Sequence, residues 1–137
     1  SREKAFMKCC ENKKISGRVV YTDRLAPLSE EFGNNILELL KKNSDLDGIF
    51  ATSDVMAANI IRACKKMGKR VPEDISIVGF DDTWISTLTY PSITTIHQPV
   101  REMCEYAIEA IGKKVKSEKV PSQVVFPVEL IDRESTK

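Results

Sequence analysis

A strand–helix–strand pattern between residues 48 and 82 constrains the fold most strongly. The apolar segment 48–51 predicts a buried strand, and the next segment, 54–67, has apolar residues at the spacings of three and four that predict a helix. Gly68 then supplies a C-terminal stop for this helix. The segment 75–80 is an almost uninterrupted apolar run, which is typical of a strand covered on both faces of its sheet. The pattern therefore predicts two parallel strands joined by a right-handed crossover.

The rest of the chain repeats this alternation. We expect helices at 2–13, 29–42, 54–67 and 99–116, and strands at 17–22, 47–51, 75–80, 93–97 and 122–131. Strands that alternate with helices of this length predict an α/β fold with a parallel sheet and helices on both faces, that is, three layers. With 137 residues, 42% hydrophobic and 30% charged, the chain is long enough for one hydrophobic core of an ordinary globular domain.

Polar side chains follow both strands of the 48–82 unit. Ser53 and Asp54 come directly after the first strand, and Asp81 and Asp82 follow the second. Because open α/β sheets bind ligands in the crevice outside the carboxyl ends of their strands, Ser53, Asp54 and Asp81 can converge on one small molecule. Two structural alternatives stay open, since Asp54 can cap the helix beside it and Asp81 can close the strand with a turn.

Composition argues against several classes of function. The formal net charge is only +1, and no dense Lys/Arg cluster or helix-turn-helix pattern is visible, so this chain alone is not expected to bind DNA. The four cysteines, Cys9, Cys10, Cys64 and Cys104, contain no C-x-x-C pair, and we expect buried, reduced thiols. No nucleophile elbow, phosphate-binding glycine loop or metal motif appears, so we expect no enzyme, no cofactor and no metal.

Several short motifs occur in a fixed order along nearly the whole chain. They are Arg2-x-x-Ala5-Phe6, Leu28-Ser29-x-x-x-Gly33, the strand-end Asp54, Val71-Pro72-x-Asp74-Ile75-Ser76, Gly79-Phe80-Asp81-Asp82 and Thr94-Thr95-Ile96-x-Gln98-Pro99. Together they resemble the effector-binding region of the LacI/GalR family of bacterial transcription regulators. The resemblance implies a periplasmic-binding-protein-like fold of type I.

The resemblance also implies a domain organisation. Residues 1–92 match the C-terminal subdomain of the effector-binding domain, 93–118 match a hinge crossing and a helix of the N-terminal subdomain, and 119–137 match a return strand and tail. In the family, a DNA-binding headpiece and most of the N-terminal subdomain precede this region. Because the chain has no initiator Met and opens into a helix with no strand before it, we expect a C-terminal subdomain fragment.

The function that the resemblance implies is effector sensing in a cytoplasmic transcriptional regulator, in particular a repressor. A small molecule, such as a sugar or a related polar metabolite, would bind between the subdomains of a homodimer and control DNA binding allosterically. Operator DNA would be contacted only through the absent headpiece, and no membrane would be involved. The alternative is an extracytoplasmic sugar-binding protein of a transport system, which has a similar fold and cleft.

The resemblance assigns roles to individual residues. The ligand contacts that it implies are Arg2, Leu28, Ser53, Asp54, Asp81 and Trp84. Asp81 is the strongest candidate, whereas Asp82 is expected in a turn or hinge. Leu28 stands where many relatives have an aromatic residue that stacks on a sugar or base, which weakens any prediction of pyranose stacking.

Further residues match the dimer interface and the hinge of the family. The expected dimer interface comprises Ala58, Arg62, Trp84, Leu88 and Tyr90, and the expected hinge comprises Thr95, His97 and Gln98. For His97 we expect a structural hydrogen bond rather than a catalytic role. The helix at 99–116 has one apolar side, and we expect it to pack back on its own domain or to exchange with another copy of the chain.

Overall fold

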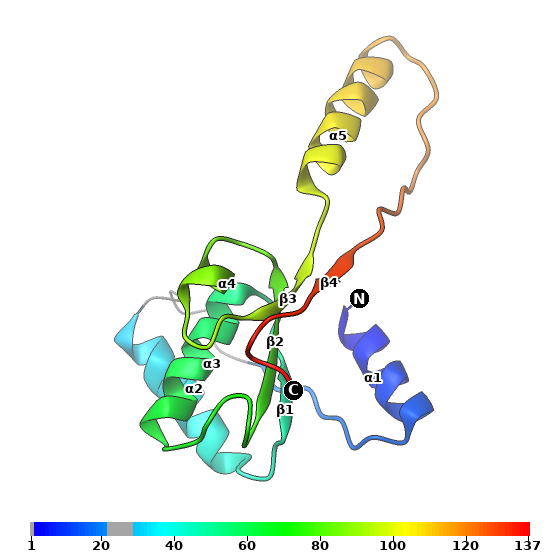
Figure 1. Cartoon of the computed structure of the whole chain (residues 1–137). Helices are drawn as coiled ribbons and strands as arrows, with labels where there is room; N and C mark the ends of the chain where they lie inside the picture. Colours follow the sequence, from blue (N-terminus) through cyan, green and yellow to red (C-terminus); the bar gives the residue numbers. More distant parts are fainter. Residues whose placement is uncertain (1, 22–28) are drawn as a thin grey trace.

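Helices and strands alternate along the chain, as the sequence predicts. The computed structural model describes residues 2–21 and 29–137. Its elements, labelled in Figure 1, are α1 (Arg2–Lys13), α2 (Glu30–Lys42), β1 (Gly48–Phe50), α3 (Asp54–Lys66), β2 (Ser76–Asp81), α4 (Ile85–Leu88), β3 (Thr94–His97), α5 (Val100–Val115) and β4 (Glu129–Ile131). The four predicted helices all form, and each begins and ends within one residue of its predicted bounds.

The strands form one mixed sheet in the order β1-β2-β3-β4. The pairs β1·β2 and β2·β3 are parallel, whereas β4 runs antiparallel to β3. The antiparallel pair forms because the chain leaves the sheet through β3, passes along α5 and returns beside the same strand (Figure 1). Because β1, β2 and β3 are parallel, the carboxyl ends of β1 and β2 lie at the same end of the sheet as the point where the chain leaves β3 for α5.

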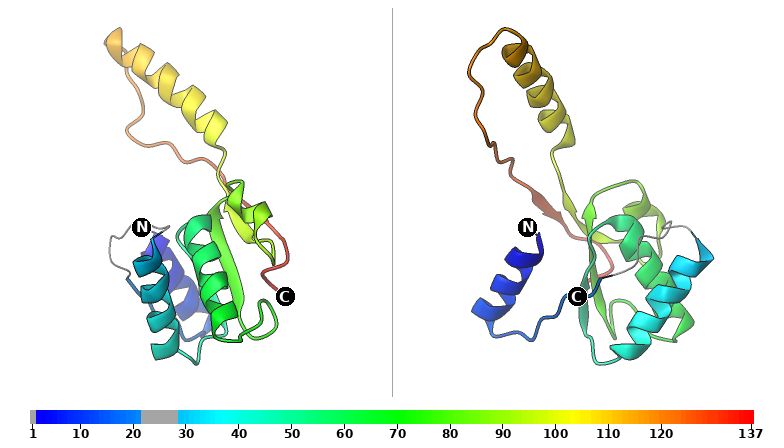
Figure 2. Two further views of the ribbon diagram at one scale, coloured as in Figure 1. Left: turned by 90° about the vertical axis from the view of Figure 1, so that its left-hand side faces the viewer. Right: turned by 180° about the vertical axis from the view of Figure 1, so that it is seen from behind.

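The hydrophobic core lies between the sheet and the pair α2 and α3. Its buried side chains come from both helices and from the strands, and include Phe32, Ile36, Ile60, Cys64, Ile77 and Ile93. The helix α2 begins at Ser29, whose Oγ accepts a hydrogen bond from the N–H of Phe32 at 3.1 Å. The helix α1 lies on the other side of the sheet from α2 and α3 (Figures 1 and 2), which gives the expected three layers.

The helix α5 and the segment that returns from it form an arm that projects from the sheet (Figures 1 and 2). No residue of α5 is buried, and Ile108, Ile111 and Val115 are exposed. Tyr106 contacts Phe126 of the returning segment, with ring centroids 5.8 Å apart. The expectation that this helix packs back on its own domain is therefore wrong, because the amphipathic pattern identifies the apolar side but not what covers it. Exchange with another copy stays a prediction.

Three further details differ from the sequence prediction. Residues 17–21, the described part of the predicted strand 17–22, form no strand. The predicted strand 122–131 is limited to Glu129–Ile131, because only these residues pair with β3. The short helix α4 was not expected, since four residues are too few for a periodic apolar pattern.

Candidate ligand-binding site at the strand ends

The carboxyl end of β2 places Asp81 and Asp82 at a sharp change of chain direction. Both residues have positive φ, 102° for Asp81 and 52° for Asp82, a region that few residues other than glycine adopt and that aspartate tolerates better than most. The Asp81 carboxylate is half-buried, and its Oδ1 accepts a hydrogen bond of 2.7 Å from Nε2 of Gln98. A residue expected to contact ligand is thus bonded directly to a residue expected in the hinge.

The Asp82 carboxylate joins three segments of the chain. Its Oδ1 accepts a hydrogen bond from Nη2 of Arg133 at 2.7 Å, and its Oδ2 lies 3.0 Å from Nδ1 of His97. Burial raises the pKa of Asp82, but the hydrogen bonds from Arg133 and His97 outweigh burial and hold the pKa below its ordinary value. His97 therefore makes the structural hydrogen bond expected for it, and Asp82 is held between β3, which carries His97, and the C-terminal tail, which carries Arg133.

Arg133 is a residue that the sequence analysis missed. Its Nη1 donates to Oγ of Ser86 at 3.0 Å and to the carbonyl oxygen of Ile93 at 2.9 Å, while its Nη2 bonds Asp82. The guanidinium therefore ties the C-terminal tail to α4 and to the start of β3. In the sequence, Arg133 belongs to a polar tail, Asp-Arg-Glu-Ser-Thr. A polar tail does not indicate that one of its side chains has buried partners.

Ser53 takes the helix-capping role that the sequence offered to Asp54. Ser53, not Asp54, caps α3, since its Oγ accepts a hydrogen bond from the N–H of Met56 at 3.2 Å. Asp54 is fully buried, and its Oδ2 accepts from the N–H and Oγ1 of Thr83 at 2.6 and 3.0 Å. Its Oδ1 accepts from Oγ1 of Thr95 at 2.5 Å. The predicted helix cap at Asp54 is therefore wrong, and a carboxylate so enclosed is better assigned to holding the strand ends together than to a ligand.

Arg2 lies at the same edge of the sheet, on the side of α1. Its Nη1 donates to the carbonyl oxygen of Thr52 at 2.9 Å, and its Cζ lies 4.2 Å from the centroid of the Phe80 ring. The Phe80 ring packs edge-on against Phe50, which stacks with Phe6 of α1, each pair with centroids 6.2 Å apart. The three phenylalanine rings therefore support the Arg2 guanidinium at the carboxyl end of β1, where it forms this hydrogen bond.

The remaining predicted site residues lie in different places. Leu28 falls outside the described residues. Trp84, Leu88 and Tyr90 are exposed around α4, at 71%, 73% and 90% of their full accessible area, so together they present an apolar surface. Ala58 is half-buried, and Arg62 is exposed, with a side chain that reaches over Gly33 of α2.

Thr95 is the most enclosed of the expected hinge residues. It is fully buried, and besides donating to Asp54 its Oγ1 accepts a long hydrogen bond, 3.4 Å, from the N–H of Asp82. The structure therefore brings together Asp81, Asp82, Thr95, His97 and Gln98. It places Trp84 with the exposed apolar residues of α4 instead.

The cysteines and acidic residues show no metal site in the part of the chain that the structure describes. Cys10 and Cys64 are buried, as predicted, and burial raises the pKa of the Cys64 thiol. The prediction of buried thiols is wrong for Cys9 and Cys104, which are exposed on α1 and on the projecting α5. Among the described residues, no helix has the length and apolar character that crossing a membrane requires.

Comparison with known proteins identifies the family of this chain. The family model described as a periplasmic binding protein-like domain matches residues 1–136. The chain belongs to this family. Its relatives are LacI-type transcription regulators, so the resemblance noted in the sequence is confirmed.

Two relatives and one solved structure illustrate the extent of the similarity. The ribose operon repressor of Halalkalibacterium halodurans is 31% identical over 137 residues, which are 99% of this chain and 40% of the repressor. The HTH-type transcriptional regulator MalR of Clostridium butyricum is 42% identical over 101 residues, 74% of this chain and 30% of the regulator. A periplasmic binding protein/LacI transcriptional regulator from Alkaliphilus metalliredigens, complexed with D-xylulofuranose, has a TM-score of 0.86 at 31% identity and covers 99% of this chain and 51% of its own. The chain thus spans about half or less of the length of these relatives.

Proposed function

We propose that this chain is part of the effector-sensing domain of a bacterial LacI-type transcription regulator, in particular a repressor, and that it binds a small polar molecule such as a sugar. The observation that carries the proposal is the Asp81 carboxylate, half-buried at the carboxyl end of β2 and bonded to the hinge residue Gln98. A carboxylate in this position suits the hydroxyl groups of a sugar. Relatives with solved structures are complexed with D-xylulofuranose, cellobiose and lactose, which supports this class of ligand.

The proposed mechanism is a shift between two arrangements of the hinge. Gln98 donates to the oxygen of Asp81 that a ligand hydroxyl would also approach, and Asp82 joins His97 to Arg133 beside it. A ligand that binds one arrangement better than the other shifts the equilibrium by its differential affinity. In a homodimer of the whole protein, that shift would change the spacing of the DNA-binding headpieces.

The alternative function is that of a sugar-binding protein of a transport system. It differs from the regulator in its N-terminal segment, which would be a signal peptide rather than a helix-turn-helix domain. The relatives named above are regulators or operon repressors, which favours the regulator and a cytoplasmic location.

Thermal unfolding of the full-length protein tests the proposed ligand class. D-ribose, D-xylulose, cellobiose, lactose and their phosphates would be added one at a time to the wild type, Asp81→Ala and Asp45→Ala. Asp45 is an exposed aspartate that pairs with Arg18 away from the strand ends, and serves as the matched control. We expect one ligand to raise the Tm of the wild type and of Asp45→Ala but not of Asp81→Ala. A ligand that raises all three equally would contradict the proposed site.

A further inference from the structure

The C-terminal tail, residues 132–137, is bonded into the sheet. The strands β2 and β3 pair from Val78 and Thr94 onward, and Ser135 of the tail supplies the partner of Ile77, one residue earlier. Its carbonyl oxygen accepts from the N–H of Ile77 at 2.8 Å, and its Oγ accepts from the N–H of Thr94 at 2.8 Å. The same Oγ donates to the carbonyl oxygen of Ile77 at 2.5 Å, and Ser135 is fully buried. The tail is therefore held by main-chain and side-chain bonds to both strands.

This anchor fixes the place of Arg133, two residues earlier. The N–H of Arg133 donates to Oγ1 of Thr94 at 2.9 Å. In its side chain, Nη1 directs its two hydrogens to Ser86 and to the carbonyl oxygen of Ile93, while Nη2 donates to Asp82. Because a guanidinium is planar and presents its donors in fixed directions, these three bonds to three segments of the chain fix its orientation.

Arg133 is the more effective of the two cationic partners of the Asp82 carboxylate. Its side chain is only 18% exposed, whereas that of His97 is 47% exposed, so water screens the bond from His97 more strongly. Arginine is also charged at every physiological pH, whereas His97 carries a charge only when it is protonated. The tail therefore does most to position the Asp82 carboxylate.

The backbone at Asp81 and Asp82 requires restraint of this kind. Their φ angles are 102° and 52°, and residues other than glycine keep positive φ only where the surrounding structure holds them. The hydrogen bond from the N–H of Asp82 to Oγ1 of Thr95 restrains the turn weakly, because it is long, at 3.4 Å. The bond from Arg133 to Asp82 is 2.7 Å and joins two charged groups, so it is the stronger restraint.

The residues on either side of Asp82 show where this restraint acts. Thr83, which follows it, is held separately, since its N–H and hydroxyl bond Asp54. Asp81, which precedes it, is the candidate ligand contact, and its carboxylate accepts from Gln98 at 2.7 Å. Asp82 therefore connects a fixed residue to the candidate ligand contact. We expect the peptide between Asp81 and Asp82 to rotate if the Asp82 side chain is released.

We propose that Arg133 is a positioning residue of the strand-end site: from the C-terminal tail it fixes the Asp82 carboxylate, and with it the left-handed turn that presents Asp81 to a ligand. The part of the inference that concerns a ligand rests on the proposed function, whereas the part that concerns the turn does not. The tail thereby contributes to effector binding, although Arg133 lies 51 residues from Asp82 in the chain.

Crystal structures of the full-length protein, grown under the same conditions, test the turn without a ligand. In the wild type we expect positive φ at residues 81 and 82. In Arg133→Gln we expect at least one of these angles to become negative, or the turn to occupy two conformers, because negative φ is the ordinary state of L-residues. This readout does not depend on the overall stability of the variant. Positive φ at both residues of a single, unchanged conformer would overturn the proposal.

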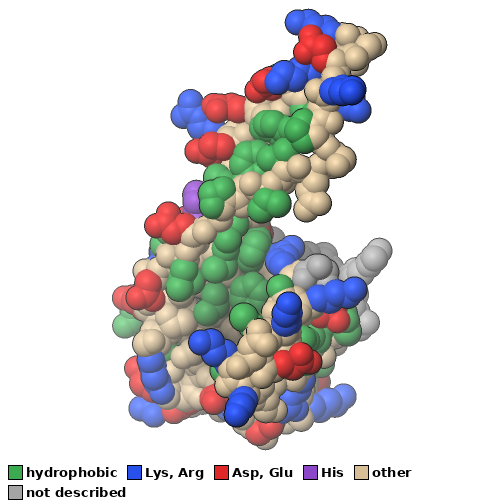
Figure 3. Space-filling model, turned by 90° about the vertical axis from the view of Figure 1, so that its right-hand side faces the viewer, with side chains coloured by type: hydrophobic (Ala, Val, Ile, Leu, Met, Phe, Trp, Pro, Cys, Tyr) green, Lys and Arg blue, Asp and Glu red, His purple; other side chains and the backbone are tan. Residues whose placement is uncertain are grey.

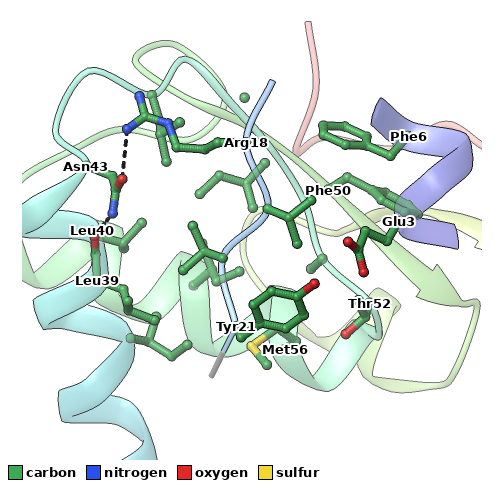
Figure 4. A pocket seen from close by; sticks show the side chains of 18 of the residues that line it. Glu3, Phe6, Arg18, Tyr21, Leu39, Leu40, Asn43, Phe50, Thr52 and Met56 are labelled. Carbon is green, nitrogen blue, oxygen red and sulfur yellow. Dashed lines mark hydrogen bonds between the residues drawn. The ribbon is translucent and has the colours of Figure 1, made fainter. Parts of the chain in front are cut away.

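Arg18→Gln is the matched control for loss of a guanidinium that joins distant segments. Arg18 bonds Asn43 and Asp45, which precede β1. Figure 4 shows Arg18 and Asn43 across a cavity of about 380 Å³ from Thr52, which follows β1. Arg18 therefore lies away from the strand ends, and φ at residues 81 and 82 should be the same in Arg18→Gln as in the wild type. A change equal to that in Arg133→Gln would overturn a specific role of Arg133.

Arg133→Lys covers the case in which Arg133→Gln does not fold. The lysine keeps the positive charge beside Asp82, but one ammonium group cannot bond Ser86, Ile93 and Asp82 in the directions of the guanidinium. We expect a change of the same kind as in Arg133→Gln but smaller. A lysine variant with the turn and the ligand affinity of the wild type would overturn the proposal.

A double-mutant cycle tests whether Arg133 acts on the ligand through Asp82. The probe is whichever of D-ribose, D-xylulose, cellobiose and lactose raises the Tm of the wild type, and its affinity is measured by calorimetry at a temperature at which all variants are folded. Arg133→Gln and Asp82→Asn should each weaken binding by about tenfold or more, and the double variant should bind no more weakly than the weaker single variant. Arg18→Gln should bind as the wild type does.

The outcomes of the cycle separate this proposal from the proposed function. Losses that multiply to about a hundredfold in the double variant would mean that Arg133 and Asp82 act independently, and would overturn the proposal. Wild-type affinity in Arg133→Gln would also overturn it. If none of these sugars binds the wild type, the proposed ligand class is wrong, and the crystal structures still decide whether Arg133 holds the turn.

Discussion

At the scale of single residues, the consecutive aspartates that end β2 have different partners. Asp81 accepts a hydrogen bond from the side chain of Gln98 and keeps part of its surface exposed. Asp82 is bonded by His97 and Arg133, and its side chain is only 18% exposed. The first carboxylate is therefore partly accessible from solvent, whereas the second ties the end of β2 to β3 and to the C-terminal tail.

The pH dependence of stability should reveal the role of Asp82. Its pKa in the folded chain lies below the unfolded value, so its ionised form stabilises the fold at pH values above the unfolded pKa, and this contribution is lost as the pH falls through the folded pKa. We expect Asp82→Asn to lower the free energy of unfolding by about 1–3 kcal/mol at pH 7. The difference from wild type should shrink as the pH falls below about 4.

Urea unfolding at pH 7 and pH 3 measures this difference. Asp45→Asn is the control, because Asp45 is an exposed residue with an exposed partner, Arg18, and its removal should change stability little at either pH. A loss for Asp82→Asn that is the same at both pH values would show that its charge does not matter.

At the scale of the elements, one glycine sets how closely β2 approaches the buried Asp54. A Cβ at Gly79 would collide with Oδ1 of Asp54 and would lie 3.0 Å from Cγ2 of Ile93. Both neighbours are buried, and Asp54 is held by Thr83 and Thr95, so neither can move without losing contacts. We expect Gly79→Ala to lower the free energy of unfolding by about 1–3 kcal/mol in a urea titration.

Gly112 of α5 supplies the matched control for Gly79. It lies in a helix with no atom within 4 Å of a Cβ placed there, so Gly112→Ala should stabilise the helix by about 0.5–1 kcal/mol. Its φ is also ordinary for a helix, unlike that of Gly68, which is 72°. A Gly79→Ala variant as stable as wild type would mean that Asp54 can give way, and that its bonds to Thr83 and Thr95 are weaker than the geometry indicates.

The sequence predicted the long helices and the polar strand ends, but it did not predict the partners of Arg133 or the position of α5. The period of apolar residues located α2, α3 and α5, because each of these helices buries one face or presents one apolar side. The residues at the strand ends were found because polar side chains interrupt apolar runs at fixed places. Arg133 could not be found in this way, since its partners Ser86 and Ile93 lie 47 and 40 residues away in the chain. The position of α5 was missed for a related reason. Periodicity identifies the apolar side of a helix, but it does not indicate which part of the structure that side contacts.

At the scale of the whole molecule, exposed apolar residues gather on two surfaces of the described chain that could contact other parts or copies of the protein. One comprises Trp84, Leu88 and Tyr90 around α4, and the other is the apolar side of the arm, which includes Ile108 and Ile111. Figure 3 shows hydrophobic side chains along the arm that continue onto the body of the molecule. We propose that the α4 surface pairs two copies of the chain, and that the arm packs against the rest of the effector-binding domain in a longer protein.

Sedimentation of two charge variants separates these surfaces. Leu88 and Ile108 are exposed to nearly the same extent, 73% and 72%, so that Leu88→Arg and Ile108→Arg are a matched pair that differs in the surface it alters. If α4 forms the dimer interface, the wild type and Ile108→Arg sediment as dimers, whereas Leu88→Arg sediments as a monomer, because a desolvated and unpaired guanidinium would oppose association. Circular dichroism of both variants should match the wild type, since neither side chain contributes to the core. The opposite result, with Ile108→Arg monomeric and Leu88→Arg dimeric, would contradict the α4 interface and would show that copies of this chain associate by exchanging their arms.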